Sequence, residues 1–265
     1  MRGSLPCIID IAAIHGIDGI FLNRHFVEHL DYSKLPDKEQ VELFLKGRRS
    51  IRTYKDEPVS KETIEKLLDI ARYAPSGINR QPVNWVVIIG KEKVHELGCL
   101  ISKWMDGLVK AKSPIAESLH FDRLVEPWNK GEDRICRSAP CIVTAYGLKD
   151  DPLVPQSCTI AGEYLELAAF GLGLGACWAG YVSMAIIMSE EVRKFAGISS
   201  RAVAGASMMI GYAKYRYSLI PSRNPAHIIW KNGAILLETF SSDHGSARCC
   251  LACRGAFYDS MGDVR

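Results

Sequence analysis

The stretch GLGLGACWAGYV, residues 171–182, carries the chain out of a helix and into a strand. Residues 156–170 before it have the apolar spacing of a helix, with one side formed by Ile160, Tyr164, Leu167 and Ala168. In the dinucleotide-binding fingerprint GxGxxG the glycines instead follow a strand and open a helix, so this stretch matches that fingerprint poorly. Its glycines indicate either a tight turn or a close approach of the backbone to a flat ligand.

Helices outnumber strands on both sides of this stretch. Asp37 and Ser60 have side chains that cap helix N-termini, and we expect Gly47 to follow the end of the first helix as its C′ residue. Further helices are predicted at residues 91–112, as one or two helices, and at 189–195. Strands are predicted at residues 85–89 (short and buried), 141–146 and 202–212. Residues 113–133 are expected to form a helical excursion or a mobile cover. This uneven order predicts an α+β or α/β fold.

Composition excludes several classes of protein. The 265 residues carry a net charge of only +3, and 48% of them are hydrophobic, so bulk charge indicates neither a nucleic-acid nor a membrane partner. No apolar run is long enough to span a membrane, and we expect no signal peptide. The nine cysteines are odd in number and scattered, which favours reduced thiols in a cytoplasmic protein. We expect a domain at residues 37–232, between an N-terminal extension (1–36) and an irregular tail (233–265).

Three arginines crowd into GRRSIRTYKD, residues 47–56: Arg48, Arg49 and Arg52 surround Ser50. Guanidinium groups bind phosphate oxygens through paired hydrogen bonds, and a hydroxyl adds a neutral donor. If this segment is locally helical, Arg48 and Arg52 share a face. The alternative is a solvated basic turn that pairs with Asp56 and Glu57.

A second candidate segment is PSGINRQP, residues 75–82, a stiff loop between a predicted helix and a predicted strand. Asn79 and Gln81 each offer a donor and an acceptor, which suits the edge of a heteroaromatic ring with alternating carbonyl and N–H groups. Ser76 can cap or donate.

Together RRSIRTY, APSGINRQP, GLGLGACWAG and MMIGYAKY resemble the FMN-dependent nitroreductase family, over about three quarters of the chain. The likeness is to members in which a ferredoxin-like module precedes the flavin domain. The resemblance implies an α+β three-layer sandwich in which helices flank a mixed central sheet. It also implies a homodimer, with FMN bound between the subunits.

The resemblance implies a cofactor site made of separate segments. The phosphate and ribityl chain would be bound by Arg48, Arg49, Ser50 and Arg52. A late arginine, Arg223, would return to the phosphate, with Lys214 as the alternative. The isoalloxazine would be lined by Pro75, Ser76, Gly77, Asn79 and Gln81. Backbone of Trp178, Ala179 and Gly180 would lie near flavin N5.

The implied activity is hydride transfer from NAD(P)H through flavin N5 to an oxidised acceptor such as a nitroaromatic or quinone, with ping-pong kinetics. No catalytic side chain is assigned, because no histidine pairs with a carboxylate at a telling spacing. Alternatives are a flavin-dependent dehalogenase, a flavin-cleaving enzyme, or a non-enzymatic flavin- or nucleotide-binding sensor.

Two departures from the family pattern stand out. Val83 follows QP where the family often has tryptophan, and Trp85 comes two residues later. Residues 1–36 contain only Cys7, so an iron–sulfur cluster is not expected there. The tail carries Cys249, Cys250 and Cys253, for which a zinc site is the alternative to exposed thiols; we assign no metal.

Overall fold

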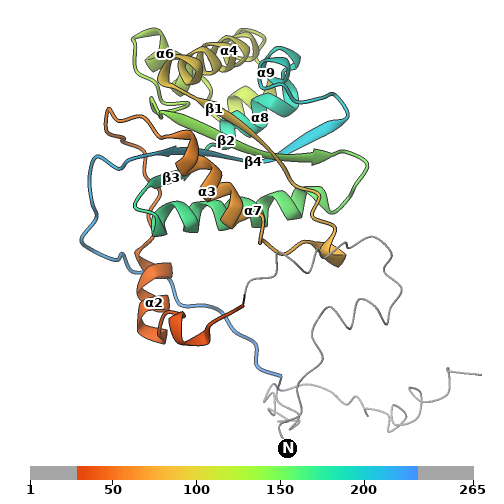
Figure 1. The fold of residues 1–265 in the computed structure, drawn as a ribbon. Coiled ribbons are helices and arrows are strands. Elements are labelled where there is room, and N and C mark those ends of the chain that lie inside the picture. The colour runs from red at the N-terminus through yellow and green to blue at the C-terminus, as the bar shows by residue number, and fades with distance from the viewer. Residues whose placement is uncertain (1–28, 232–265) are drawn as a thin grey trace, which may run out of the picture. The chain divides into compact units, whose positions relative to one another are not determined.

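The computed structural model describes residues 29–231. Cys7 and the cysteine triplet of the tail lie outside these residues. The chain divides into two units, residues 1–221 and 222–265. In the second unit, residues 222–231 form neither helix nor strand. All the elements below belong to the first unit (Figure 1).

The described helices, in chain order, are η2 (Tyr32–Lys34), α2 (Lys38–Gly47), α3 (Lys61–Ala71), η3 (Gly77–Asn79), α4 (Lys91–Lys110), α5 (Pro114–Ser118), α6 (Asp122–Asn129), α7 (Val154–Gly171), α8 (Gly180–Met188) and α9 (Glu190–Phe195). The described strands are β1 (Asn84–Ile89), β2 (Cys141–Leu148), β3 (Gly175–Trp178) and β4 (Ala202–Gly211). Residues 91–110 therefore form one long helix, and the region 113–133 is helical.

The four strands form one sheet in the order β1-β2-β4-β3, and each neighbouring pair is antiparallel. A parallel bridge between Ser50 and Ala176 adds the arginine segment beside β3, which gives the sheet its mixed character. The register of β2 on β4 shifts between Ala145 and Tyr146.

Helices cover both faces of the sheet, which confirms the three-layer α+β architecture. One face packs against α4, α6, α8 and α9, and the other packs against α3 and α7 (Figure 1). The centres of the two cores include Phe121, Met105 and Ile142 on the first side and Leu67, Leu165 and Ile210 on the second. Within residues 29–231, no helix is both long and apolar enough to cross a bilayer.

The helix starts follow from the local sequence. Asp37 accepts a hydrogen bond from the backbone of Gln40, whose side chain bonds back to Asp37, so a capping box opens α2. Ser60 caps α3 through the Thr63 amide. Gly47 is the last residue of α2 rather than a left-handed residue beyond it, because the chain leaves the helix directly into extended backbone at Arg48.

One prediction about burial is wrong. The strand at residues 84–89 is an edge strand, and Val87 and Ile89 are exposed. On α7, Tyr164 is exposed, whereas the buried face carries Ala161, Leu165 and Ala169. In both elements apolar residues occur on each side, and only packing decides which side is covered.

Candidate functional site

The arginine segment is extended rather than helical, because it attaches to the edge of the sheet. The Ile51 amide donates to the Ala176 carbonyl at 2.8 Å, and the Lys55 amide donates to the Tyr212 carbonyl at 2.8 Å. Side chains of extended backbone alternate between two sides. Arg48 and Ser50 approach α7 and Cys177, while Ile51 packs on β3. The conditional prediction of a local helix is therefore wrong: Arg48 reaches Glu166 on α7, whereas Ser50 and Arg52 lie near Cys177.

The glycines of residues 171–175 serve the backbone. Gly173 has φ of +79° in the turn after α7, where a residue with a side chain would be strained. A Cβ atom on Gly175 would lie only 2.7 Å from the Ile51 side chain, so this glycine lets the arginine segment reach β3. A turn accounts for Gly173, and a contact within the chain accounts for Gly175. Neither glycine therefore indicates a close approach to a ligand.

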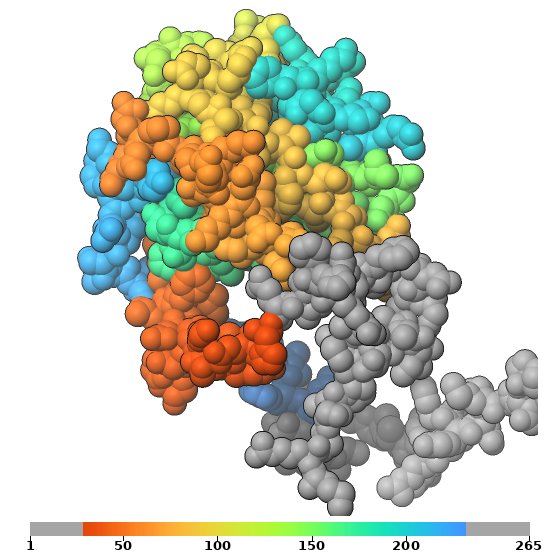
Figure 2. Space-filling model, viewed as in Figure 1, coloured from red at the N-terminus to blue at the C-terminus, as the bar shows by residue number. Residues whose placement is uncertain are grey.

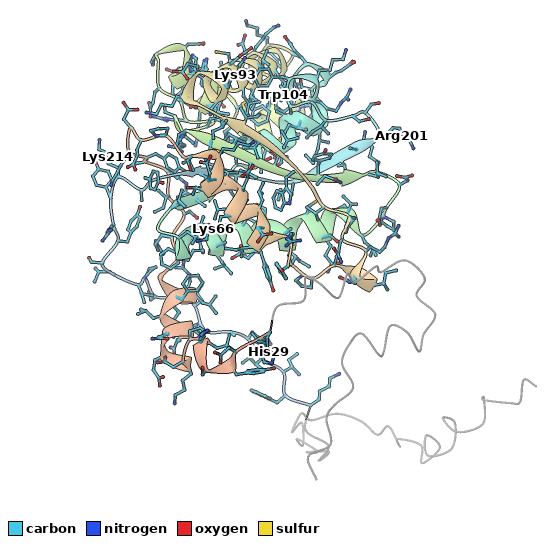
Figure 3. All side chains as sticks on the ribbon, in the orientation of Figure 1. His29, Lys66, Lys93, Trp104, Arg201 and Lys214 are labelled. Atoms are coloured by element: carbon cyan, nitrogen blue, oxygen red, sulfur yellow. The ribbon has the colours of Figure 1, made fainter. Side chains whose placement is uncertain are left out.

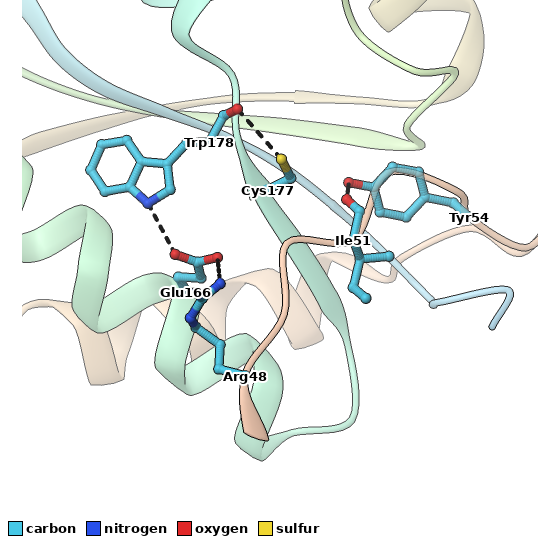
Figure 4. A network of polar contacts seen from close by, with 6 residues as sticks. All are labelled: Arg48, Ile51, Tyr54, Glu166, Cys177 and Trp178. Carbon is cyan, nitrogen blue, oxygen red and sulfur yellow. Dashed lines mark hydrogen bonds and ion pairs between the residues drawn. The ribbon is translucent and has the colours of Figure 1, made fainter. Parts of the chain in front are cut away.

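A buried carboxylate joins the arginine segment to the end of β3. Glu166 of α7 is 3% exposed, and its Oε1 accepts a hydrogen bond from Arg48 at 2.7 Å. Its Oε2 accepts from the indole Nε1 of Trp178 at 2.9 Å (Figure 4). Burial raises the pKa of this carboxyl group, and the Arg48 guanidinium opposes that rise. The sequence analysis missed Glu166; the available signal was an acid within the apolar run LELAA.

Cys177 and Tyr54 also lie close to the arginine segment. Burial raises the pKa of the Cys177 thiol, against the opposing effect of Arg52, so the thiol stays protonated at neutral pH. The Tyr54 hydroxyl donates to the Ile51 carbonyl at 2.6 Å, and burial raises its pKa well above the usual range (Figure 4). These neutral side chains fix the arginine segment in place.

A groove of about 1000 Å³ opens beside the segment. The cations that line it are Arg48, Arg49, Lys55, Lys214 and Arg216, and Glu166 contributes the carboxylate. Phe44 of α2 and Phe170 of α7 also line it, and their ring centroids lie 5.2 Å apart. The chemistry of this lining suits an anion that carries an apolar body.

The C-terminal side of the groove comes from the segment after β4. The Lys214 amide donates to the Thr53 carbonyl at 3.0 Å, which ties this segment to the arginine segment. Arg49 stacks over the Tyr217 ring at 5.5 Å. Lys214, on the loop that follows β4 (Figure 3), therefore lies with the predicted phosphate-binding residues. Arg223 is in the second unit, and its assignment stays a prediction.

The loop at residues 75–82 lines a different cavity of about 130 Å³, together with Ser157 and Ala161 of α7. Ile78, Asn79 and Gln81 have φ between 47° and 53°, a strained left-handed conformation for residues other than glycine. The Ser76 hydroxyl accepts from the Gln81 amide at 2.9 Å, and the exposed Gln81 side chain donates to Asn79 at 3.3 Å. Within one chain, this loop does not line the arginine groove.

The end of β3 and the start of α8 are held by hydrogen bonds to β4. The Ala179 amide donates to the Ser207 carbonyl at 2.7 Å, and the Ser183 and Ser207 hydroxyls lie 2.9 Å apart. The Ala179 amide is therefore occupied. The first amides of a helix have no partner within it, and the Cα of Gly180 faces open space. At the start of α8, Gly180 therefore offers backbone that a ligand can reach.

Comparison with known proteins agrees with this architecture. The nitroreductase family model matches residues 45–212. A protein of Methanothermobacter thermautotrophicus, provisionally named NADH dehydrogenase/NAD(P)H nitroreductase, is 26% identical over 203 residues, 74% of this chain and 84% of the relative.

Two solved structures share the fold, each with a TM-score of 0.59. One is an FMN-bound nitroreductase from Bacteroides fragilis, which is 22% identical and covers 73% of this chain and 98% of its own. The other is an FMN-bound nitroreductase from Desulfitobacterium hafniense, which is 24% identical and covers 74% and 100%. With the family model matching well over half of its length, the chain belongs to the nitroreductase family.

Proposed function

We propose that this protein is an FMN-dependent oxidoreductase that uses NAD(P)H to reduce an acceptor such as a nitroaromatic or a quinone. When bound, FMN supplies the chemistry, in which its N5 accepts a hydride from NAD(P)H and passes it to the acceptor in a second half-reaction. The main support for this proposal is that Arg48 and Trp178, 130 positions apart in sequence, both bind the buried Glu166 carboxylate beside a cationic groove. The flavin domain is residues 37–232.

The residues of the groove fit a phosphorylated flavin. Arg48 and Arg49 line the groove, where their guanidinium groups can bind one anion, and we assign Ser50 and Arg52 of the same segment as further donors to it. Lys214 adds charge from the facing segment. The open backbone at Gly180 suits the edge of a flat ring, and the aromatic side chains of the groove exclude water from an apolar body.

We further propose that the site is completed by a second copy of the chain. The loop at residues 75–82 lines its own cavity near Ala161, and Pro75, Gly77, Asn79 and Gln81 are exposed. No residue of α2 is buried, and the helix lies at the surface of the molecule (Figure 2). Leu43 and Leu45 on it are 64% and 53% exposed. A two-fold axis that covers these apolar surfaces can bring the loop of one subunit to the groove of its partner.

The first experiment is purification and absorbance. The protein should be yellow, and heating should release FMN. Arg48→Ala/Arg52→Ala should lose the flavin while keeping its helical circular dichroism. Arg134→Ala is the control, because Arg134 is exposed and pairs with Glu132 two residues away. Full FMN occupancy in the double arginine variant would contradict the assignment.

The second experiment tests the shared site by subunit complementation. Arg49→Ala damages the groove, and Asn79→Ala/Gln81→Ala damages the loop. If each site takes its groove from one subunit and its loop from the other, mixed dimers of the two variants contain one intact site and one doubly damaged site. Flavin binding should then recover to about half of the wild-type stoichiometry in the mixed dimer. No recovery in a verified mixed dimer would contradict a site shared between subunits.

A further inference from the structure

The two donors on Glu166 come from segments that the sequence separates widely. Arg48 leaves the end of α2, and Trp178 ends β3. Each oxygen of Glu166 accepts one hydrogen bond, and the donor on Oε1 is the Arg48 cation, as expected for an ionised carboxylate. The chain therefore has a buried anion whose hydrogen-bonding capacity is directed at two residues of the proposed cofactor site.

We propose that Glu166 is a positioning residue for cofactor binding: it holds the Arg48 guanidinium and the Trp178 indole in one fixed arrangement, so that the phosphate-binding and ring-binding segments are set relative to each other before the ligand arrives. This proposal rests on the proposed FMN-dependent function. It assigns no chemical step to Glu166.

Arg48 keeps donors for a ligand while it is bound to Glu166. Only its Nη1 is used at 2.7 Å, and a guanidinium has five N–H groups. The Arg48 side chain is 25% exposed, so its remaining N–H groups can reach an anion from the groove. Pairing fixes the orientation of this long side chain, whose ordering would otherwise cost conformational entropy at the moment of binding.

Trp178 also packs against α7. A Cβ atom on Gly162, one turn before Glu166 on α7, would lie 3.2 Å from the Trp178 ring. The edge of the indole that carries Nε1, Cζ2 and Cη2 therefore lies along α7 between Glu166 and Gly162, and the Glu166 bond sets its rotation. Because Trp178 is followed directly by Ala179 and Gly180, its orientation also fixes the backbone proposed to border the flavin.

The chemistry of an amide gives a specific test. Glutamine offers one oxygen and one NH₂ group, so Glu166→Gln cannot accept from both Arg48 and Trp178; one donor would face another donor. Removing a charge-assisted hydrogen bond predicts about tenfold weaker FMN binding by Glu166→Gln. In a Trp178→Phe background only Arg48 remains to be satisfied, so the amide oxygen can face it. The same substitution should then cost less than about threefold.

The measurement is FMN titration of flavin-free protein for wild type, each single variant and the double variant, combined as a double-mutant cycle. Glu163→Gln is the matched control, since it removes a negative charge from the exposed side of the same helix. An indole ¹H–¹⁵N resonance, assigned to Trp178 by its loss in Trp178→Phe, should shift in Glu166→Gln and stay in place in the control.

Equal losses of FMN affinity in both backgrounds, or an unmoved indole resonance, would overturn the positioning role. If Glu166→Gln fails to fold, the Trp178→Phe/Glu166→Gln double variant, in which the remaining donor is satisfied, should still fold and bind; failure of both would also overturn it. Wild-type protein that does not bind FMN would instead refute the proposed function, so the two failures are distinguishable.

Discussion

Gly175→Ala tests how the arginine segment is attached to the sheet. A Cβ atom at this position would lie 2.7 Å from Cβ, Cγ1 and Cγ2 of Ile51, closer than real Cβ contacts come. Overpacking of this kind costs about 1–3 kcal/mol, and the reduced entropy of the unfolded chain returns about 0.4–1 kcal/mol. We expect a net loss of about 1–2 kcal/mol in the free energy of unfolding.

The assay is thermal unfolding of flavin-free protein followed by circular dichroism. For a chain of this size, the loss corresponds to a Tm about 2–8 °C lower. FMN affinity should also fall, because Ser50 and Arg52 are displaced with Ile51. Gly107→Ala is the control: this glycine lies in α4 with open space around it, so alanine should stabilise the helix by about 0.5–1 kcal/mol.

Ile51→Ala provides a second check, because it removes two of the three atoms that the new methyl group would meet. The cost of Gly175→Ala should be smaller in that background. A Gly175→Ala variant with wild-type Tm and FMN affinity would refute the close packing of this segment on β3.

Three further predictions concern the rest of the described chain. Burial raises the pKa of Cys141 to about 12, so alkylation at pH 8 followed by peptide mass mapping should label exposed Cys99 much faster; comparable rates would be inconsistent with the burial of Cys141. Ser60→Ala removes the N-cap of α3 and should cost about 1 kcal/mol in chemical denaturation, with Ser60→Thr close to wild type. Burial raises the pKa of Glu166, so the folded state binds this proton more tightly than the unfolded state; the resulting stability is present at acid pH and is lost as pH rises through the folded pKa. Unfolding free energies of flavin-free wild type should therefore decline relative to Glu166→Gln as pH rises through that range, and a difference independent of pH would contradict the raised pKa.

The sequence allows much of the architecture to be predicted because short-range signals specify it. The caps at Asp37 and Ser60 depend on neighbours within a few residues, and each is found as expected. The family motifs then predict the three-layer fold, since they recur at fixed places along it.

What could not be predicted depends on contacts between distant segments. Glu166 looks like any acid on a helix until β3 and the arginine segment are folded against it. Gly175 suggests an approach to a ligand, yet its neighbour is Ile51. Asn79 and Gln81 belong with the other motifs in the family pattern, yet in the single chain Gln81 lines a different cavity and Asn79 is exposed.

The most direct test of the account is a crystal structure of the protein with FMN. We predict that the phosphate lies within hydrogen-bonding distance of Arg48 and Ser50, and that the ring borders Gly180 and contacts residues 75–82 of the second subunit. FMN bound away from the arginine groove, or bound wholly within one chain, would contradict the account.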